Sequence, residues 1–319
     1  MIFNIGVRVD RFDGNQQGLK DPYLLYSSYT AGELRAAGRD IVSTIGDDYI
    51  VYVDKLSSNS SLENVDIRGF RNQNGNVWYN VNGEVVSNPN DISGSSGQPL
   101  PFRKGELSET GLPSVISTDA FKDYEPQIVV MPRIAFSFPV SDKSEFKASY
   151  DVIARRPGAG YWQADYASYL YMEKMSGAAL TNPNLKPEKI TNYELGFEQA
   201  LNQNSAVKIS AYYKETRDLI QLIQYVGADP NPNYYSYDNI DFKTTKGFSL
   251  AYDLRQTKNI RLSANYTLQY AEGTGISQTT MQQLIKEGFS SLKVLSPIAD
   301  DRRHEFKLNL DFRYGAGGK

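Results

Sequence analysis

The stretch His304–Tyr314, HEFKLNLDFRY, decides the fold class. Phe306, Leu308, Leu310 and Phe312 occupy every second position, and charged or amide side chains stand between them. A period of two is that of a β-strand with one apolar face and one polar face. The stretch therefore predicts a strand whose two faces meet different surroundings.

The same alternation recurs in other segments of the chain. Their apolar faces carry no full charge, while their other faces carry many. The predicted strands centre on Phe3–Val9, Ile134–Phe138, Phe146–Val152, Tyr193–Phe197, Val207–Tyr213, Phe248–Leu254 and Ile260–Tyr270. Most approach the ~9–11 residues that a tilted strand needs to cross a bilayer. The sequence thus predicts an all-β protein with about eight such strands.

Short and long connections alternate strictly between these strands. In an antiparallel meander, successive connections lie at opposite ends, so all the long ones should share one end. Outer-membrane barrels have short periplasmic turns and long extracellular loops. We therefore predict part of an antiparallel transmembrane β-barrel, with short turns at Pro139–Ser144, Leu201–Ser205 and Arg255–Asn259 and long loops at Arg11–Pro132, Ala154–Thr191, Leu219–Lys246 and Ala271–Arg303. A soluble β-sandwich, whose strands alternate in the same way, remains the alternative.

The composition excludes several classes of site. The chain has 319 residues, no cysteine and a single histidine, His304, which rules out disulfides and a zinc site of the usual His/Cys kind. A net charge of −3 without a basic block does not suggest nucleic-acid binding. We expect no cofactor and no metal ligand set.

The longest connection, 11–132, is too long for a bare loop and is predicted to be a large extracellular insertion. Tyr49–Val53 and Asn76–Tyr79 resemble strands, and Asn82-Gly83 is a hairpin turn signal. Thr30–Ala37, and Thr279–Glu287 in the last long loop, are candidate short helices. These loops are therefore expected to be structured.

Aromatic side chains concentrate in the long loops. They either pack the loops together and mark the lipid interface, or form a ligand-contact surface, because tyrosine and tryptophan offer large contact area at low entropic cost. The sequence leaves both interpretations open. The candidate ligand contacts are Trp78, Tyr79, Tyr161, Trp162, Tyr166, Tyr234 and Tyr235.

The run Asn182–Glu188, NPNLKPE, followed by Asn192–Glu198, NYELGFE, closely resembles a loop-and-strand signature of TonB-dependent outer-membrane receptors. Its character is that of the Oar-like branch in the Bacteroidota; the related SusC-like glycan importers usually carry Trp where Pro187 stands. The motif is structural and not catalytic, because its prolines hold an extended chain. The matching residues are Asn182, Pro183, Leu185, Pro187, Glu188, Tyr193, Glu194 and Gly196.

The resemblance implies the C-terminal-half barrel region of a receptor in the bacterial outer membrane. Family members have a barrel of about 22 strands, a plug domain and a TonB box that couples transport to the inner membrane. The resemblance thus implies outer-membrane lipid, a plug, TonB and a nutrient as partners. No plug, TonB box or signal peptide is visible in the sequence, so we expect a single truncated barrel domain over 1–319 that does not transport alone.

The predicted function is TonB-dependent uptake of a bulky nutrient. The alternatives are a surface adhesin or structural outer-membrane barrel, or a soluble β-sandwich binding module. Catalysis is not expected: His304 is the only imidazole, and no G-x-S-x-G motif accompanies it. Charged residues of the polar faces are expected to line the barrel interior: Arg8, Lys147, Glu194, Glu198, Lys208, Lys307 and Arg313.

Overall fold

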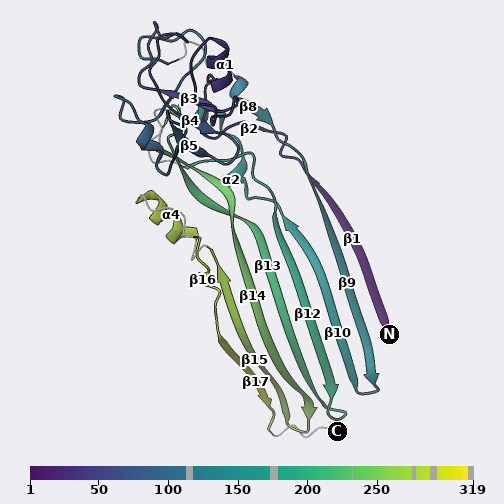
Figure 1. Cartoon of the computed structure of the whole chain (residues 1–319). Coiled ribbons are helices and arrows are strands. Elements are labelled where there is room, and N and C mark those ends of the chain that lie inside the picture. Colours follow the sequence, from purple (N-terminus) through teal and green to yellow (C-terminus); the bar gives the residue numbers. More distant parts are fainter. Residues whose placement is uncertain (113–117, 173–178, 232, 275–277, 288–292, 315–319) are drawn as a thin grey trace.

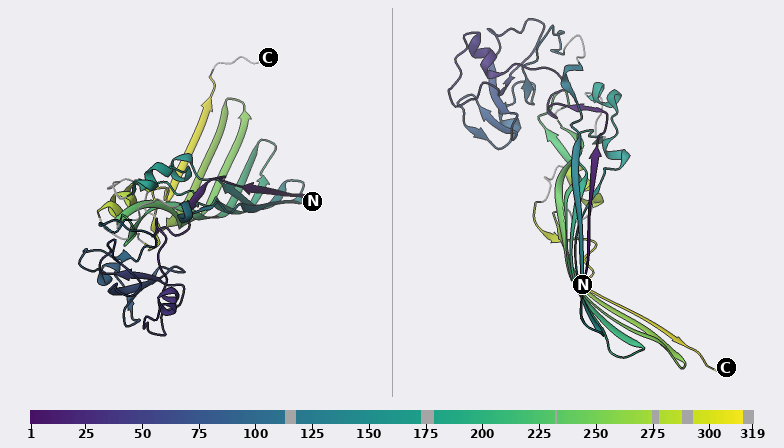
Figure 2. Two further views of the ribbon diagram at one scale, coloured as in Figure 1. Left: turned by 90° about the horizontal axis from the view of Figure 1, so that it is seen from above. Right: turned by 90° about the vertical axis from the view of Figure 1, so that its right-hand side faces the viewer.

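A single curved antiparallel sheet forms the body of the molecule (Figures 1 and 2). The computed structural model describes residues 1–112, 118–172, 179–231, 233–274, 278–287 and 293–314. Eight long strands follow one another across the sheet: β1 (Ile2–Phe12), β9 (Gln127–Ser141), β10 (Ser144–Arg155), β12 (Glu188–Ala200), β13 (Ser205–Val226), β14 (Asn233–Thr257), β15 (Ile260–Gly273) and β17 (His304–Phe312). All eight predicted strands are confirmed.

Shorter elements lie at the end of the sheet that carries the long connections. β11 (Ala179–Leu180) and β16 (Ser296–Pro297) pair with β14 and β15. The helices are α1 (Ala31–Ala36), α2 (Ala159–Trp162), α3 (Tyr166–Leu170) and α4 (Gln278–Lys286), with 3-10 turns η1 (Pro89–Ile92) and η2 (Thr118–Ala120). Within the described residues, the helices are all too short or too polar to cross a bilayer.

Strand register sorts the side chains into two opposite faces. One row across the eight strands is Phe3, Phe136, Ala148, Leu195, Ala211, Phe248, Leu268 and His304. The row beside it, on the opposite face, is Ile2, Ser137, Lys147, Gly196, Ser210, Ser249, Thr267 and Glu305. Because the side-chain period is two and the strands are in register, the apolar residues of all eight strands share one face and the polar residues share the other.

The apolar face is exposed rather than packed. Leu195 is 55 % exposed and Phe306 65 % exposed, and the other large apolar residues of this face are exposed or half-buried. A β-sandwich would cover such a face with a second sheet. The structure therefore excludes the sandwich and favours a surface that meets lipid.

The alternation of connections is also confirmed, because tight turns join β9 to β10, β12 to β13 and β14 to β15 at one end (Figure 1). The predicted long loop Leu219–Lys246 is wrong in extent, because β13 and β14 remain paired up to Val226 and Asn233. Here Leu222 and Tyr235 pack on Ile285 of α4, while Tyr225 and Tyr234 pack in a separate core. Since both faces of the hairpin are covered, its sequence lacks the alternation that marks a half-buried strand.

Within the long insertion, residues 28–112 form a compact unit that we call the head. Its sheet has the order β6 (Val85–Val86), β5 (Val77–Asn80), β4 (Ile67–Asn72), β3 (Ile50–Val53) and β7 (Leu100–Pro101). Leu34, Val51, Phe70 and Phe102 are buried in its core. Thr30 and Glu33 cap α1 reciprocally. The predicted hairpin and the predicted first helix are both present here.

A two-stranded sheet connects the head to the body. It pairs β2 (Gln17–Leu19) with β8 (Phe121–Asp123), just beyond the ends of β1 and β9. The segment between β1 and β9 spans 13–126, because both strands extend further than their alternation indicates. Figure 1 shows the head beyond the loop end of the sheet, away from the tight turns.

Candidate ligand-binding site at the loop end of the polar face

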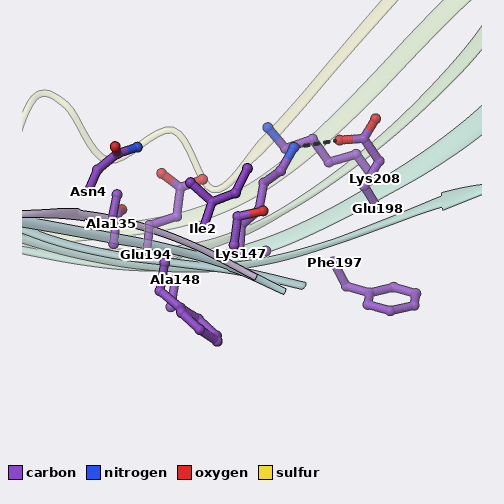
Figure 3. Close-up of a pocket in the computed structure, with 13 residues that line it drawn as sticks. Ile2, Asn4, Ala135, Lys147, Ala148, Glu194, Phe197, Glu198 and Lys208 are labelled. Carbon is purple, nitrogen blue, oxygen red and sulfur yellow. Dashed lines mark hydrogen bonds and ion pairs between the residues drawn. The ribbon is translucent and has the colours of Figure 1, made fainter. Parts of the chain in front are cut away.

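Charged side chains gather on the polar face in the middle of the sheet. Figure 3 shows Lys147, Glu194, Glu198 and Lys208 on one side of the strands and Phe197 on the other. The Lys147 ammonium lies 3.0 Å from Glu145 and 3.1 Å from Glu198. Lys147, Glu194, Glu198 and Lys208 line a shallow hollow of about 290 Å³. The arrangement is that of a solvated, ion-paired barrel wall.

The other predicted interior residues lie on the same face. Arg8 pairs with Asp10 at 2.7 Å, and Lys307 with Glu305 at 3.1 Å. Arg313, which follows β17, lies 3.4 Å from Asp311. Exposed pairs of this kind contribute little stability, so their main effect is to make the face hydrophilic.

A larger cavity of about 570 Å³ lies where this face reaches the loops. Arg155 of β10 donates to Glu188 of β12 at 2.5 and 3.0 Å. On the opposite wall, Lys243 of β14 lies 3.4 Å from Asp300. Arg156 also lines the cavity, is exposed, and has no ion-pair partner among the described residues. The cavity therefore presents a cation that is available to a ligand.

A buried hydrogen-bond chain stiffens the floor of this cavity. The Asp241 carboxylate accepts from the Gln221 amide at 3.1 Å and from the Thr274 hydroxyl at 2.8 Å. All three side chains are buried. They join β13, β14 and the end of β15, so the cavity rests on strands rather than on loops alone. A cavity that combines both charge signs with apolar residues such as Leu219, Phe242 and Ile298 suits binding of a charged ligand with apolar parts.

Residues 182–186 of the motif, which we call the motif clamp, form hydrogen bonds to the loops and to the β13–β14 hairpin. The Asn182 amide donates to the Tyr237 carbonyl at 2.7 Å, and the Asn184 amide donates to the Leu19 carbonyl at 3.0 Å. Asn239 accepts from the Lys186 N–H at 2.8 Å and donates to the Lys186 carbonyl at 3.1 Å. The motif therefore ties the base of the head to the body.

The remaining motif residues lie just before β12 or within it. Pro183, Leu185 and Pro187 are buried, and Glu188 holds Arg155. Further along, Tyr193 lies on the apolar face between Tyr150 and Tyr213, at ring-centroid distances of 5.1 and 6.2 Å. Glu194 and Gly196 lie on the polar face and line the mid-sheet hollow.

The structure separates the aromatic candidates into two groups. Trp78 is buried against Tyr52 in the head, and Tyr79 lies against Tyr49. Tyr234 and Tyr235 are buried in the β13–β14 hairpin. In these places the rings pack the fold.

The second group lies nearer the site. Tyr161 lines the 570 Å³ cavity and contacts the ring of Tyr237 edge-on at 4.9 Å. Trp162 contacts Phe12 at 5.7 Å, and the Tyr166 hydroxyl accepts from the Gln17 N–H at 2.8 Å. Of the seven candidates, Tyr161 alone lines this cavity. The cavity's charged residues were missed because Arg155, Arg156 and Lys243 do not stand out in the sequence.

His304 lies on the exposed apolar face at the end of β17. Its Nδ1 is 2.9 Å from the Tyr266 hydroxyl of the neighbouring strand. Asp301 accepts from the Ala271 N–H and from Arg303, and Asp300 lies beside Lys243. The described residues thus place no serine nucleophile or carboxylate partner on this imidazole, and the geometry required for hydrolysis is not assembled there.

A comparison with protein families identifies the family of this chain. The family model "TonB dependent receptor-like, beta-barrel" matches residues 2–318. No curated protein sequence matches the chain.

Among solved structures, the chain is similar to the FrpB iron transporter from Neisseria meningitidis, with 14 % identity and a TM-score of 0.41 over 60 % of this chain and 25 % of that one. It is similar to the copper transporter OprC, with 13 % identity and a TM-score of 0.39. The match covers 73 % of this chain and 27 % of that one. The alcaligin receptor FauA from Bordetella pertussis shows 17 % identity and a TM-score of 0.38. The match covers 63 % of this chain and 29 % of that one. The chain therefore spans only about a quarter of the length of these structures.

The assignment rests on the family model and on the geometry above. An exposed apolar face, a charged opposite face and long connections at one end are the features of an outer-membrane barrel wall. The chain is therefore an outer-membrane β-barrel segment that belongs to the TonB dependent receptor-like β-barrel family.

Proposed function

We propose that this chain forms part of the barrel wall and the outer loops of a transporter that takes up a bulky nutrient in a TonB-dependent way. The observation that carries the proposal is the charged 570 Å³ cavity, which lies at the loop end of the polar face while the opposite face is apolar and exposed. A nutrient captured there would stand at the entrance of the barrel interior. The long loops and the head would face the outside of the cell.

The same proposal supplies the partners. Outer-membrane lipid would cover the apolar face, and a plug domain would meet the charged residues of the polar face. TonB would act through a region outside this chain, so the chain alone would not transport. Family members are transporters rather than enzymes, and we propose no catalytic role for His304, whose Nδ1 lies 2.9 Å from the Tyr266 hydroxyl.

We place the protein in the Oar-like branch of the Bacteroidota receptors, because Pro187 occupies the position where the glycan importers usually carry Trp. Pro187 is buried directly before Glu188, which anchors Arg155 at the cavity. A tryptophan would need far more room at this point. The branch therefore bears on the shape of the entrance.

Uptake can be tested in the organism that encodes the chain. A strain that lacks the gene is grown on single nutrient sources of different classes: a metal chelate, an oligosaccharide and an oligopeptide. We expect growth on one class to be lost, to return with the intact gene, and to fail when a protonophore is added to the complemented strain. The gene with Arg156→Ala and Lys243→Ala should restore growth poorly.

A surface adhesin is the competing function, since long outer loops and a separate head suit it equally. It predicts unchanged growth on every nutrient together with reduced attachment of the deletion strain to surfaces. That result would contradict uptake.

A further inference from the structure

A second cavity lies at the base of the head, apart from the proposed entrance. Its volume is about 380 Å³, within the usual range for small-molecule sites, and it shares no lining residue with the first cavity. Its walls come from the β2–β8 sheet, the 182–186 part of the motif clamp, and the upper hairpin of β13 and β14. Segments distant in sequence thus meet around it.

Tyrosines form one wall of this second cavity. The Tyr124 and Tyr234 hydroxyls donate to the carbonyls of Leu185 and Pro22 at 3.2 and 2.6 Å, and Tyr169 donates to Thr181. The fourth, Tyr225, is stacked on Tyr234 with a centroid distance of 4.9 Å and is only 6 % exposed. Among the described residues its hydroxyl has no hydrogen-bond partner. This hydroxyl is not among the fully buried side-chain atoms, so it can donate to a group that enters the cavity.

Lys122 and Glu125 line this cavity as an ion pair at 3.5 Å, whereas its other charged residues are unpaired among the residues that the structure describes. One Asp238 oxygen accepts from the Asn239 N–H at 2.8 Å, and the described residues leave the other oxygen without a partner. Burial raises the pKa of Asp238, and the Asn239 N–H and the charge of Lys186 oppose that rise. Lys186 and Lys20 line the cavity, and neither has a carboxylate within ion-pair distance in the described part of the chain. A partly buried carboxylate and a nearby ammonium therefore remain separate.

We propose that this cavity binds a free α-amino acid as a zwitterion. Its carboxylate lies against the ammonium groups of Lys186 and Lys20, its ammonium lies against Asp238, and its side chain lies along the Tyr225–Tyr234 wall. A zwitterion neutralises the lysine ammonium groups and the Asp238 carboxylate together, whereas a simple anion or a simple cation would neutralise only one of the two charge types. Charge-assisted hydrogen bonds of this kind are stronger than neutral ones.

The location of the second cavity also distinguishes its ligand from a transported bulky nutrient. The cavity is bounded by the motif clamp, in which Asn184 holds the Leu19 carbonyl and Asn239 holds the Lys186 backbone. A bound amino acid would bridge the base of the head to the hairpin. The site therefore does not depend on the proposed transport function, and binding can be measured on the chain itself.

The test measures binding of phenylalanine to the full chain, folded in detergent micelles, by isothermal titration calorimetry. N-acetylphenylalanine, which keeps only the carboxylate, and phenylalanine amide, which keeps only the ammonium, are the comparison ligands. Leucine, glutamate and lysine cover other side-chain types. We expect phenylalanine to bind saturably and both single-charge analogues to bind at least roughly tenfold more weakly, as loss of a charge-assisted bond implies.

Variants locate the site. Lys186→Met keeps the backbone bonds to Asn239, and Asp238→Asn keeps an oxygen for the Asn239 N–H, so both preserve the clamp. Each should weaken phenylalanine binding about tenfold or more, and Tyr225→Phe by less. Lys243→Met, the same change in the other cavity, should leave binding unaltered.

Three results would overturn the proposal. The first is equal affinity for phenylalanine and N-acetylphenylalanine, which would mean an anion site. The second is binding that Lys186→Met and Asp238→Asn leave unchanged. The third is no saturable binding of any of the amino acids by a chain whose far-ultraviolet circular dichroism is that of a folded β-protein.

Discussion

The guanidinium of Arg103 in the head donates to both carboxylate oxygens of Asp229 at the tip of the β13–β14 hairpin. The two residues are 126 positions apart, and their side chains are only 6 % and 4 % exposed. Arg103 also donates to the Gly111 carbonyl at 2.6 Å. Backbone bonds from Leu25 to Asp229 and from Asp229 to Tyr23 surround the pair. The head is therefore locked onto the body by a buried charge pair.

Asp229→Asn should destabilise this junction strongly, because it leaves a buried guanidinium without its counter-charge. Loss of one partner of a buried pair costs about 3–5 kcal/mol. Limited proteolysis should then cut within 13–126 much faster than in the wild type, and the melting temperature of the head should fall. Asp66→Asn is the matched control, since Asp66 is 71 % exposed and lies 3.8 Å from Arg68. Equal protease resistance of Asp229→Asn and Asp66→Asn would contradict the lock.

The motif clamp predicts coupling between two residues at the base of the head. A Cβ at Gly18 would lie 2.6 Å from the side-chain amide of Asn184, so Gly18→Ala should destabilise by displacing that amide. Asn184→Ala should cost about 1–3 kcal/mol because the Leu19 carbonyl loses its donor. The double variant should cost less than the sum of the two, since the clash is gone. Additive unfolding free energies in a double-mutant cycle would show that Gly18 and Asn184 do not press on each other.

The two faces of β12 predict opposite responses to the same change at adjacent positions. Leu195→Arg places a charge on the exposed apolar face and should cost about 2–4 kcal/mol near the bilayer midplane. Glu194→Arg places it on the polar face and should cost far less. Urea unfolding of the full-length receptor in phospholipid bilayers measures both. A similar loss for the two variants would mean that the apolar face does not meet lipid.

The head should lose stability in acid through Asp54. Its pKa is lowered to about 2 by the N–H and hydroxyl of Ser95 and by Arg68, from an ordinary value of 3.8. Because the folded pKa lies below the unfolded one, the stabilisation is complete above pH 3.8 and disappears as pH falls towards 2. Thermal melts of wild type and Asp54→Asn should therefore converge in that interval. A constant difference between them from pH 6 to pH 2 would refute this contribution.

The upper hairpin shows where sequence reasoning failed. Leu222, Tyr225, Tyr234 and Tyr235 carry no alternation, because α4 covers one face and the core below the head covers the other. The sequence predicts a loop over Leu219–Lys246, although these residues belong to paired strands. Trp78 and Tyr235, two of the aromatic candidates, are buried in the fold, and only folding shows which loop side chains are covered.

The sequence by itself determined the eight-strand sheet, its two chemically different faces, the side on which the long connections lie, and the family. These features are local, since each strand repeats its own period of two and each turn follows directly after a strand. Only the tertiary structure decided that Arg103 meets Asp229, that Asn184 holds Leu19, and that Arg155, Arg156 and Lys243 line one cavity. Those contacts join segments far apart in the chain, and their partners follow from strand register and from the packing of the head, which no local pattern encodes.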